Sequence, residues 1–468
     1  MINKFVLPLT IMTFFIVSQP IYSEIYKVDP YIVSKGKDMS PLDPEDFLKL
    51  ALLFSGVDSK DVPKWVKAIH NYSNPIIDEL LTEPSVSKRA EALLLILHNS
   101  IFKKYREEET RLTILYNDGI FNCVSSSVMY MYMAEKAGIT IVPVATPDHA
   151  FCSIYVNDQI IDIETTTKYG FNPGEKKEFT NAFGDITGFS YVPPGHYTKR
   201  WDVSDKELLG FILSNQISLL QRQQKFDQTV PLAMTRNALE QTPESEQFLE
   251  DTFKNWGAFL NMRNQYLQGI SAMKMVEEEF PHFNEVKEVA GILVYNRLVS
   301  LINNKQTQKA QNEWSQYKNT IQIDQINRDK IDKMMKTDDL QTILKNGDFE
   351  TARQYLKSVE KDLSKSQINE YTTYLYSKEA KRIETSEGMK QAYHFLKSAD
   401  PDILKIAKVK SILDMYEYNY IISIHNNFAT LFNAGRYEEA QTLLNSVDEL
   451  VRKSSRLQQD QKLLDKQR

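Results

Sequence analysis

Hydrophobic residues along this chain follow two spacings, and each spacing predicts a different element. Apolar side chains recur three and four residues apart over long stretches, as they do on one face of an α-helix. They alternate in a segment from Ala150 to Val156, which turns at Asn157-Asp158 and returns through Gln159 to Thr166. Alternation around a short polar turn is typical of a β-hairpin. The pattern therefore predicts a hairpin with helices before and after it.

Before the hairpin the signals are mostly helical. Asp43 is placed to cap a first helix, and Pro63 stands in the first turn of a second. Ser85 or Ser87 begins a third helix. Its apolar positions repeat at helical spacing and are Ala90, Leu93, Leu94, Leu97 and Ile101. We expect this third helix to pack against the helix that begins at Cys123.

The stretch Asn122-Cys123-Val124-Ser125 opens a helical run that continues to Gly138. A thiol in the first turn of a helix lies in the positive field of the macrodipole, which favours the thiolate. Unpaired backbone N–H groups at the same end can hold the oxyanion that forms when a carbonyl is attacked. Cys123 is therefore the candidate nucleophile.

The hairpin offers this cysteine a base and an acid. If its loop is the two-residue turn, His149 faces Thr166, and Glu164 is its diagonal neighbour, roughly 7–8 Å away between backbones. Asp162 lies on the same face but further along, so Glu164 is our candidate acid and Asp162 the fallback. A three-residue loop would turn both carboxylates to the other face.

The segment from Gly170 to Tyr197 is rich in Gly, Pro, Asn and aromatic residues, which predicts an irregular loop. Two interpretations stay open, a wall of a substrate groove or a plain linker. His196 in this segment is a rival base. We rank it below His149 because no alternating strand surrounds it and no acid stands on a matching return strand.

The order of a cysteine, a histidine at a strand start and an acid on the next strand is one of the orders of a Cys-His-acid triad. Four short motifs also resemble the transglutaminase-like superfamily. They are Gly119-Ile120-Phe121-Asn122-Cys123-Val124-Ser125, Ala137-Gly138-Ile139, Pro147-Asp148-His149-Ala150-Phe151 and Ile163-Glu164-Thr165-Thr166.

This resemblance extends from Leu93 to Phe171 and implies a papain-like cysteine hydrolase fold, with helices packed on an antiparallel sheet. It implies that Cys123 attacks an amide, that His149 takes and returns the proton and that Glu164 orients the imidazole. The family usually has an aspartate before Pro-Thr at the third position, where this chain has Glu164-Thr165-Thr166.

Residues 1–23 have the composition of a secretory signal peptide. A short basic start is followed by an apolar core of about a dozen residues and by Ser23, a small residue, before Glu24. An N-terminal core helix and an uncleaved anchor are the alternatives, the latter because Ile21 is not the small residue usual before a cleavage site. No other run is long and apolar enough to cross a bilayer. The sequence thus predicts an exported protein, periplasmic or secreted.

Beyond Asp202, glycine and proline become scarce and helix-forming stretches follow one another. Similar turn motifs recur between these stretches, at 224–229, 264–269, 305–310, 346–352 and 434–440. Their final residues are roughly 40 positions apart or a multiple of that, a period typical of stacked helix pairs. The last two motifs resemble tetratricopeptide repeats, although that family has a period of about 34. An irregular helical bundle is the alternative.

We therefore predict a signal peptide at 1–23, a transglutaminase-like domain at 24–200, tetratricopeptide-like helical repeats at 201–454 and a polar tail at 455–468. The corresponding fold class is an α+β domain followed by an all-α helical-repeat solenoid.

Composition narrows the functional classes. The chain has 468 residues, of which 25% are charged, and a formal net charge of −6. It therefore lacks the strong positive charge that is typical of nucleic-acid-binding proteins. With two cysteines there is no disulfide framework, and Cys152 should pack inward, away from the direction of His149. His98 fits a helix-surface or core histidine. Because no His, Cys or carboxylate pair has zinc-like spacing, we predict neither a metal nor a cofactor.

Two functions from different classes fit these features. The first is an exported cysteine enzyme for acyl transfer or hydrolysis at an amide or peptide bond, whose repeats recruit a protein partner or substrate. Water as acceptor would make it a protease or amidase, and an amine would make it a transglutaminase. The alternative is a catalytically inactive scaffold that binds partners through its repeats. It is favoured by the length of the repeats and by Glu164 in place of Asp.

Overall fold

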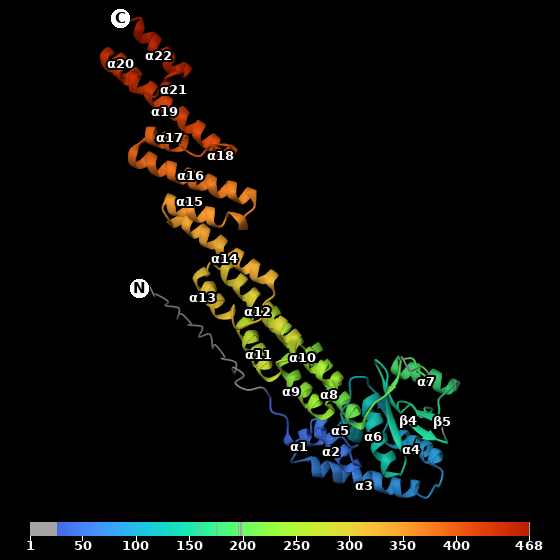
Figure 1. Ribbon diagram of the computed structural model, residues 1–468. Helices are drawn as coiled ribbons and strands as arrows, with labels where there is room; N and C mark the ends of the chain where they lie inside the picture. The colour runs from blue at the N-terminus through green and yellow to red at the C-terminus, as the bar shows by residue number, and fades with distance from the viewer. Residues whose placement is uncertain (1–25, 158, 175, 195, 197–198, 468) are drawn as a thin grey trace, which may run out of the picture. The chain divides into compact units, whose positions relative to one another are not determined.

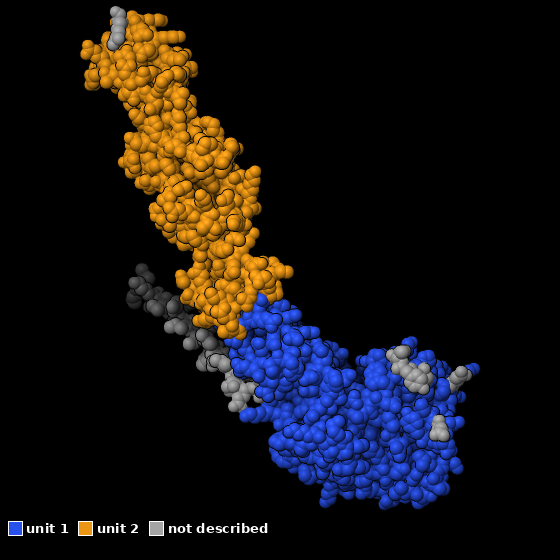
Figure 2. Space-filling view, viewed as in Figure 1, with its two compact units in different colours: residues 1–297, 321–323 blue, residues 298–320, 324–468 orange. Residues whose placement is uncertain are grey.

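The computed structural model describes residues 26–157, 159–174, 176–194, 196 and 199–467, so the predicted signal peptide at 1–23 lies outside the described residues. The chain forms two compact units (Figure 2). The first extends to Arg297 and includes Ile321–Ile323, and the second comprises Leu298–Thr320 and Asp324–Arg468. The domain boundary at 200/201 stays a prediction.

The N-terminal part is mostly helical, and the structure confirms the three helix starts that the sequence predicts, near Asp43, Pro63 and Ser85. In chain order the helices are α1 (Pro30–Lys37), α2 (Pro44–Phe54), α3 (Val62–Leu80), α4 (Val86–Ser100) and α5 (Leu112–Asp118). The Asp43 carboxylate accepts hydrogen bonds from two N–H groups at the start of α2, and the Ser85 hydroxyl accepts one at the start of α4. Both predicted caps are confirmed.

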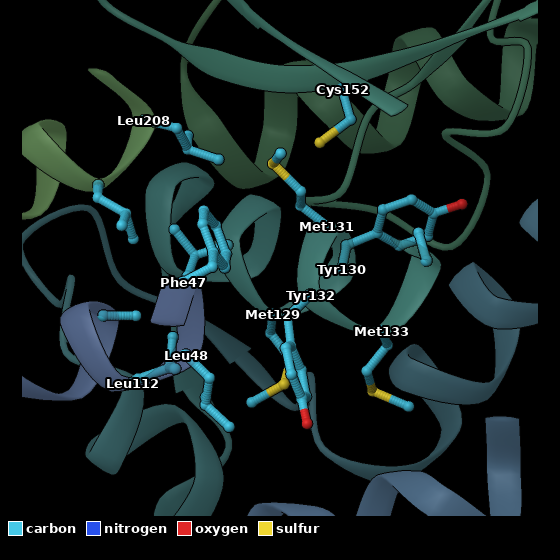
Figure 3. Packing of buried hydrophobic residues seen from close by; sticks show 14 of the residues in the cluster. Phe47, Leu48, Leu112, Met129, Tyr130, Met131, Tyr132, Met133, Cys152 and Leu208 are labelled. Atoms are coloured by element: carbon cyan, nitrogen blue, oxygen red, sulfur yellow. The ribbon is translucent and has the colours of Figure 1, made fainter. Parts of the chain in front are cut away.

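Helix α6 (Cys123–Lys136) is the centre of the first unit, and nearly all its residues are buried. Figure 3 shows Met129 to Met133 of this helix surrounded by Phe47, Leu112, Leu208 and Cys152 from other elements. The Tyr130 hydroxyl donates a 2.8 Å hydrogen bond to the Ala90 carbonyl, so α4 packs on α6 as predicted. Burial on all sides explains why the residues from Val128 to Ala134 form an apolar run without polar interruption.

A small antiparallel sheet lies against this helix (Figure 1). Its strands are β3 (Ile141–Ala145), β4 (Ala150–Val156), β5 (Gln159–Ile163) and β6 (Trp201–Asp202), in the order β5-β4-β3-β6. In the hairpin, Ser153 pairs with Asp162 and Cys152 with Ile163, which confirms the predicted register. A separate parallel pair joins β1 (Lys104–Tyr105) to β2 (Ile120–Phe121).

The segment predicted as an irregular loop contains a helix, α7 (Lys177–Thr187). Phe179 and Phe183 are buried on its inner face, and their rings stack at 5.2 Å. The prediction of irregular structure for the whole segment is therefore wrong. Burial of two aromatic rings outweighs the poor helix propensity of residues such as Asn181 and Gly184.

From Asp205 onward long helices alternate with shorter ones. They are α8 (Asp205–Arg222), α9 (Thr229–Glu240), α10 (Pro243–Met262), α11 (Tyr266–Glu279), α12 (Asn284–Asn303), α13 (Thr307–Tyr317), α14 (Gln325–Asn346), α15 (Phe349–Ser358), α16 (Lys365–Glu387), α17 (Met389–Lys397), α18 (Pro401–Leu404), α19 (Ala407–Asn433), α20 (Tyr437–Asn445), α21 (Glu449–Arg452) and α22 (Ser455–Asp465), with 3₁₀ turns at Phe226–Gln228 and Glu360–Asp362.

The long helices α10, α12, α14, α16 and α19 start about 40 residues apart, the period read from the turn motifs. Each is followed by a short helix that buries a small residue early in its length: Gly269, Ala310, Ala352, Ala392 and Ala440. The stretch predicted as a polar tail contains α22, whose Leu457 and Leu464 are buried. Its Asp460 carboxylate contacts His425 Nδ1 of α19 at 2.9 Å.

The predicted fold class is wrong. The described chain is predominantly helical, its longest strand has 7 residues, and a single four-stranded sheet is a minor part of the first unit. Helices α8 to α11, assigned by sequence to a separate solenoid, belong to the same compact unit as this sheet. An α+β domain followed by an independent solenoid therefore does not describe the molecule. The hairpin motif predicted one local element correctly but not the helical packing around it.

Candidate functional site

Cys123 is the first residue of α6, where the sequence places it. Asn122 caps the helix: its side chain accepts a 2.9 Å hydrogen bond from the Ser125 N–H, and the Ser125 hydroxyl accepts a 3.0 Å bond from the Asn122 N–H. The Asn122 amide also donates to the Glu107 carbonyl at 2.9 Å. These bonds fix the helix start, so the thiol is held in the first turn with 7% of its residue surface exposed.

His149 and Glu164 form a buried pair next to this thiol. His149 Nε2 lies 2.7 Å from Glu164 Oε2, and their side chains are 5% and 0% exposed. Burial alone would lower the pKa of His149. The negative charges of Glu164 and Cys123 and hydrogen bonds with both residues outweigh burial, so its pKa lies well above the ordinary value. The structure thus brings Cys123, His149 and Glu164 together and favours the protonated form of the imidazole.

Several groups hold the Glu164 carboxylate in place. Its Oε1 accepts hydrogen bonds from the Thr166 N–H at 3.1 Å and from the Thr166 hydroxyl at 2.8 Å. The Glu164 N–H donates to the Gly170 carbonyl at 2.9 Å. A Cβ at position 170 would lie 1.9 Å from the Glu164 carbonyl oxygen, so only glycine fits there. The close return of the chain at Gly170 therefore fixes the backbone of the acid.

Thr165, the residue between Glu164 and Thr166, is held by contacts with α6 and α4. The Thr165 hydroxyl contacts the Ser126 hydroxyl at 2.7 Å and the Ser127 hydroxyl at 3.1 Å, which connects the end of β5 to α6. His98 Nε2 lies 3.1 Å from the Thr165 carbonyl oxygen. Burial lowers the pKa of His98 to about 4, so this histidine is neutral and donates the bond. It acts as a buried support and not as a ligand.

Asp162, the fallback acid, has a different set of partners. Its carboxylate accepts hydrogen bonds from the Arg200 guanidinium at 2.7 and 2.9 Å, from the Ser153 hydroxyl at 2.7 Å and from the Tyr191 hydroxyl. Arg200 also lies over the Phe151 ring, 4.9 Å from its centroid. The structure does not bring Asp162 to His149, and Glu164 takes that place.

Aromatic side chains cover the imidazole. The ring centroids of Phe183 and Phe189 lie 5.3 and 5.5 Å from that of His149, and Phe151 stacks on it at 6.2 Å. Phe183 belongs to α7, the helix that the sequence did not predict. The segment after the hairpin therefore covers the imidazole, and its role as the wall of a substrate groove stays a prediction.

The remaining candidates lie away from this arrangement. Both cysteines are free thiols. Cys152 is fully buried on the opposite face of β4 with its Sγ 3.9 Å from the Ser127 carbonyl oxygen, and burial raises the pKa of its thiol. His196 is exposed. Within the described residues, no group of His, Cys, Asp and Glu side chains has the arrangement of a metal site, and no helix is long and apolar enough to span a membrane.

Sequence reasoning missed Arg200, Tyr191, Gly170 and Tyr105 as parts of this region. Arg200 and Tyr191 donate hydrogen bonds to Asp162 from a segment whose sequence has no helical or strand periodicity. No repeating pattern therefore indicated that these two residues belong to this region. Gly170 was visible only as one of several turn glycines. The Tyr105 hydroxyl is buried without a hydrogen-bond partner, and the charge on Cys123 acts on it.

Comparisons with known proteins give little further guidance. No protein-family model matches the chain, and no curated protein matches it. A crystal structure of menin, described as revealing the binding site for Mixed Lineage Leukemia (MLL) protein, aligns with 82% of this chain and 94% of that chain at 13% identity. The TM-score of 0.25 is too low to show a shared fold.

These results correct the family assignment made from sequence. No family match accompanies the transglutaminase-like or tetratricopeptide-like motifs, and the predominantly helical chain does not have the expected hydrolase fold. The transglutaminase-like and tetratricopeptide-like resemblances are therefore wrong as descriptions of the chain, and so is the cysteine-hydrolase fold that the first of them implied. Short motifs around a hairpin and a helix start arise from capping and turn chemistry as well as from descent.

Proposed function

We propose that this chain is a protein-interaction protein whose second unit binds a partner through its helix pairs. The observation that carries this proposal is a cleft of about 680 Å³ in the second unit, lined by residues of α15, α16, α17 and α18. Three aromatic rings, those of Phe349, Tyr376 and Phe395, contact one another there at centroid distances of 5.1 to 5.6 Å. Concave apolar surfaces of this size are where proteins bind ligands and partner side chains.

The edge of the cleft is polar. Arg353 and Lys357 stand on α15, and Asp400 and Asp402 stand at the start of α18, all exposed. An apolar floor with a charged edge is the usual anatomy of a protein-binding surface, in which buried aromatics supply most of the affinity. Ile403 is half-buried in the lining and offers a position at which the cleft can be altered.

The test is capture of partners by the full chain and by two matched variants. Ile403→Lys puts a charge in the cleft. Ile326→Lys puts the same charge on α14 of the second unit, at a side chain that is 68% exposed and outside the cleft lining. Polypeptides retained by the wild type and by Ile326→Lys but lost with Ile403→Lys support the proposal. Equal retention by all three proteins rules out the cleft, and no retention by the wild type rules out the function.

A second candidate function is acyl transfer by a nucleophilic Cys123, with water or an amine as acceptor. It is favoured by the buried His149–Glu164 pair beside the thiol at a helix start. Cys123 would attack a carbonyl carbon, His149 would hold and return the proton, and Glu164 would orient the imidazole. The helix pairs would then present a protein or peptide substrate, so the two candidate functions are compatible.

Iodoacetamide labelling of the folded protein at pH about 6 tests this candidate, since an ordinary thiol with a pKa of about 8.5 is mostly protonated there. Cys123 should be alkylated and Cys152 left unmodified. His149→Gln should slow labelling of Cys123, because it removes the imidazolium that stabilises the thiolate. If Cys123 is unreactive in the folded wild type, acyl transfer is excluded and the interaction function remains as the single candidate. If the predicted export signal is used, either function operates outside the cytoplasm, and N-terminal sequencing of the mature protein tests this.

A further inference from the structure

Tyr105 lies beside the candidate nucleophile because of the parallel pair β1–β2. Tyr105 pairs with Phe121, and Phe121 is followed by Asn122 and Cys123. The edge of the Tyr105 ring meets the Phe121 ring, with centroids 6.0 Å apart and planes at 84°. This backbone pairing places Tyr105 beside the strand that leads into α6, and the charge of Cys123 acts on its phenol.

The Tyr105 hydroxyl is buried and has no hydrogen-bond partner. A buried hydroxyl without a partner destabilises a fold by about 1–3 kcal/mol, so each such group calls for an explanation, and a catalytic role is one of them. Burial raises the pKa of Tyr105, and the charges of Cys123, Glu107 and Glu164 raise it further. The phenol therefore keeps its proton and can act only as a neutral donor or acceptor near the thiol.

The other polar group next to the thiol is already engaged. His149 Nε2 lies 2.7 Å from Glu164 Oε2, and a hydrogen bond joins the imidazole to Cys123. The Tyr105 hydroxyl, in contrast, has no hydrogen-bond partner. Of the two groups, the phenol is therefore the one that can bind a polar atom of a ligand.

We propose that the Tyr105 hydroxyl is the hydrogen-bond donor for the carbonyl oxygen of an acyl group attacked by Cys123. This rests on the second candidate function. The thiolate forms a bond to the carbonyl carbon, and the carbonyl electron pair moves to oxygen as an oxyanion. When the oxyanion collapses, its electron pair re-forms the carbonyl bond, the bond to the leaving group breaks, and the leaving group departs with the electrons of that bond. An amine leaving group takes the proton that His149 holds. The phenol donates to the oxygen as its negative charge develops, which is where a donor lowers the barrier.

Two probes separate this role from a structural one. p-Nitrophenyl acetate acylates a thiolate through an oxyanion and releases nitrophenolate, whereas iodoacetamide alkylates the same thiolate without forming one. Tyr105→Phe removes only the hydroxyl. The matched control is Tyr116→Phe on α5, whose lost hydroxyl donates to the Ala68 carbonyl at 3.0 Å. Both rates at Cys123 are measured on the full-length chain, together with the urea midpoint of each variant.

We expect Tyr105→Phe to slow acylation by roughly a hundredfold or more, the effect of losing one oxyanion donor. Alkylation should stay at the wild-type rate, and stability should be unchanged or higher, because an unpaired buried hydroxyl is removed. Tyr116→Phe should leave both rates unchanged. Equal slowing of acylation and alkylation, or no slowing of either, overturns the proposal. A wild-type Cys123 that reacts with neither probe contradicts the candidate function itself.

Discussion

Two buried ion pairs stand on one face of the hairpin, and they differ in whether their cation can lose its proton. Glu164 pairs with His149, and Asp162 pairs with Arg200. All four side chains are almost fully buried. Arg200 stays charged at any working pH, whereas a histidine can gain and lose its proton. Only the pair that contains His149 can therefore take part in proton transfer with Cys123.

The surroundings of the two carboxylates reinforce this difference. Asp162 accepts from a guanidinium and two hydroxyls and so joins β5 to the segment that follows α7. Glu164 accepts from Thr166 on one oxygen and leaves the other to the imidazole. Both carboxylates are buried and each pairs with a basic side chain. Asp162 fixes the segment after α7, whereas Glu164 aligns a ring that can titrate.

The largest expected effect is that of Glu164→Gln on acylation of Cys123. The neutral amide keeps the shape of the side chain but neither stabilises an imidazolium nor selects the required tautomer. We expect the rate with p-nitrophenyl acetate to fall roughly 10³-fold or more. Asp162→Asn should leave the rate of the folded protein nearly unchanged. The measurement is nitrophenolate release, and equal losses in both variants would remove the distinction between the pairs.

The two variants should rank in the opposite order when the free energy of unfolding is measured. Asp162→Asn removes the carboxylate that pairs with the buried Arg200 guanidinium, which should cost about 3–5 kcal/mol. Glu164→Gln should cost less, because His149 can become neutral. Urea unfolding in a Trp314→Phe background reports the first unit, since the other tryptophans of the chain, at positions 65, 201 and 256, belong to it. A larger loss from Glu164→Gln would contradict this assignment.

The pH dependence of stability sharpens the comparison. The pKa of His149 is raised in the folded state, so its contribution to stability is complete below the unfolded value of about 6.5 and is lost as pH rises through the folded pKa. The wild type should therefore lose stability relative to Glu164→Gln between pH 6 and alkaline pH. Asp162→Asn should follow the wild-type slope, because Arg200 does not titrate. If the stability of the wild type and of Glu164→Gln changed with pH along parallel slopes, the pKa of His149 would not be raised in the folded state.

The same two pairs show what the sequence can predict here. The register that brings Glu164 to His149 follows from strand alternation and turn length, and the start of α6 follows from a capping residue. These are short-range rules, and the structure agrees with them. The contact of Asp162 with Arg200 joins residues 38 positions apart through a segment without periodicity, so no local pattern predicts it.

The sequence also did not predict how elements far apart along the chain pack against one another. Helix α7 forms because Phe179 and Phe183 find an apolar surface around His149 and Tyr191, and not because its residues favour helix. The first compact unit ends at Arg297 within α12, where neither composition nor periodicity changes. Propensity and spacing define individual elements, whereas the choice of neighbours depends on complementary surfaces that a single sequence does not display.

The smallest expected effects come from removing one hydroxyl donor from each carboxylate. Tyr191→Phe takes a donor from Asp162, which keeps Arg200, and Thr166→Val takes one from Glu164, which keeps the backbone N–H. Each should cost about 1 kcal/mol in the same urea assay, because one hydrogen bond is lost and the others remain. Only Thr166→Val should alter the pH profile of Cys123 alkylation, since a loosened carboxylate holds the imidazolium less firmly. If Tyr191→Phe shifted that profile as much, Asp162 would act on the thiol despite its distance from His149, and the two pairs would be one coupled system.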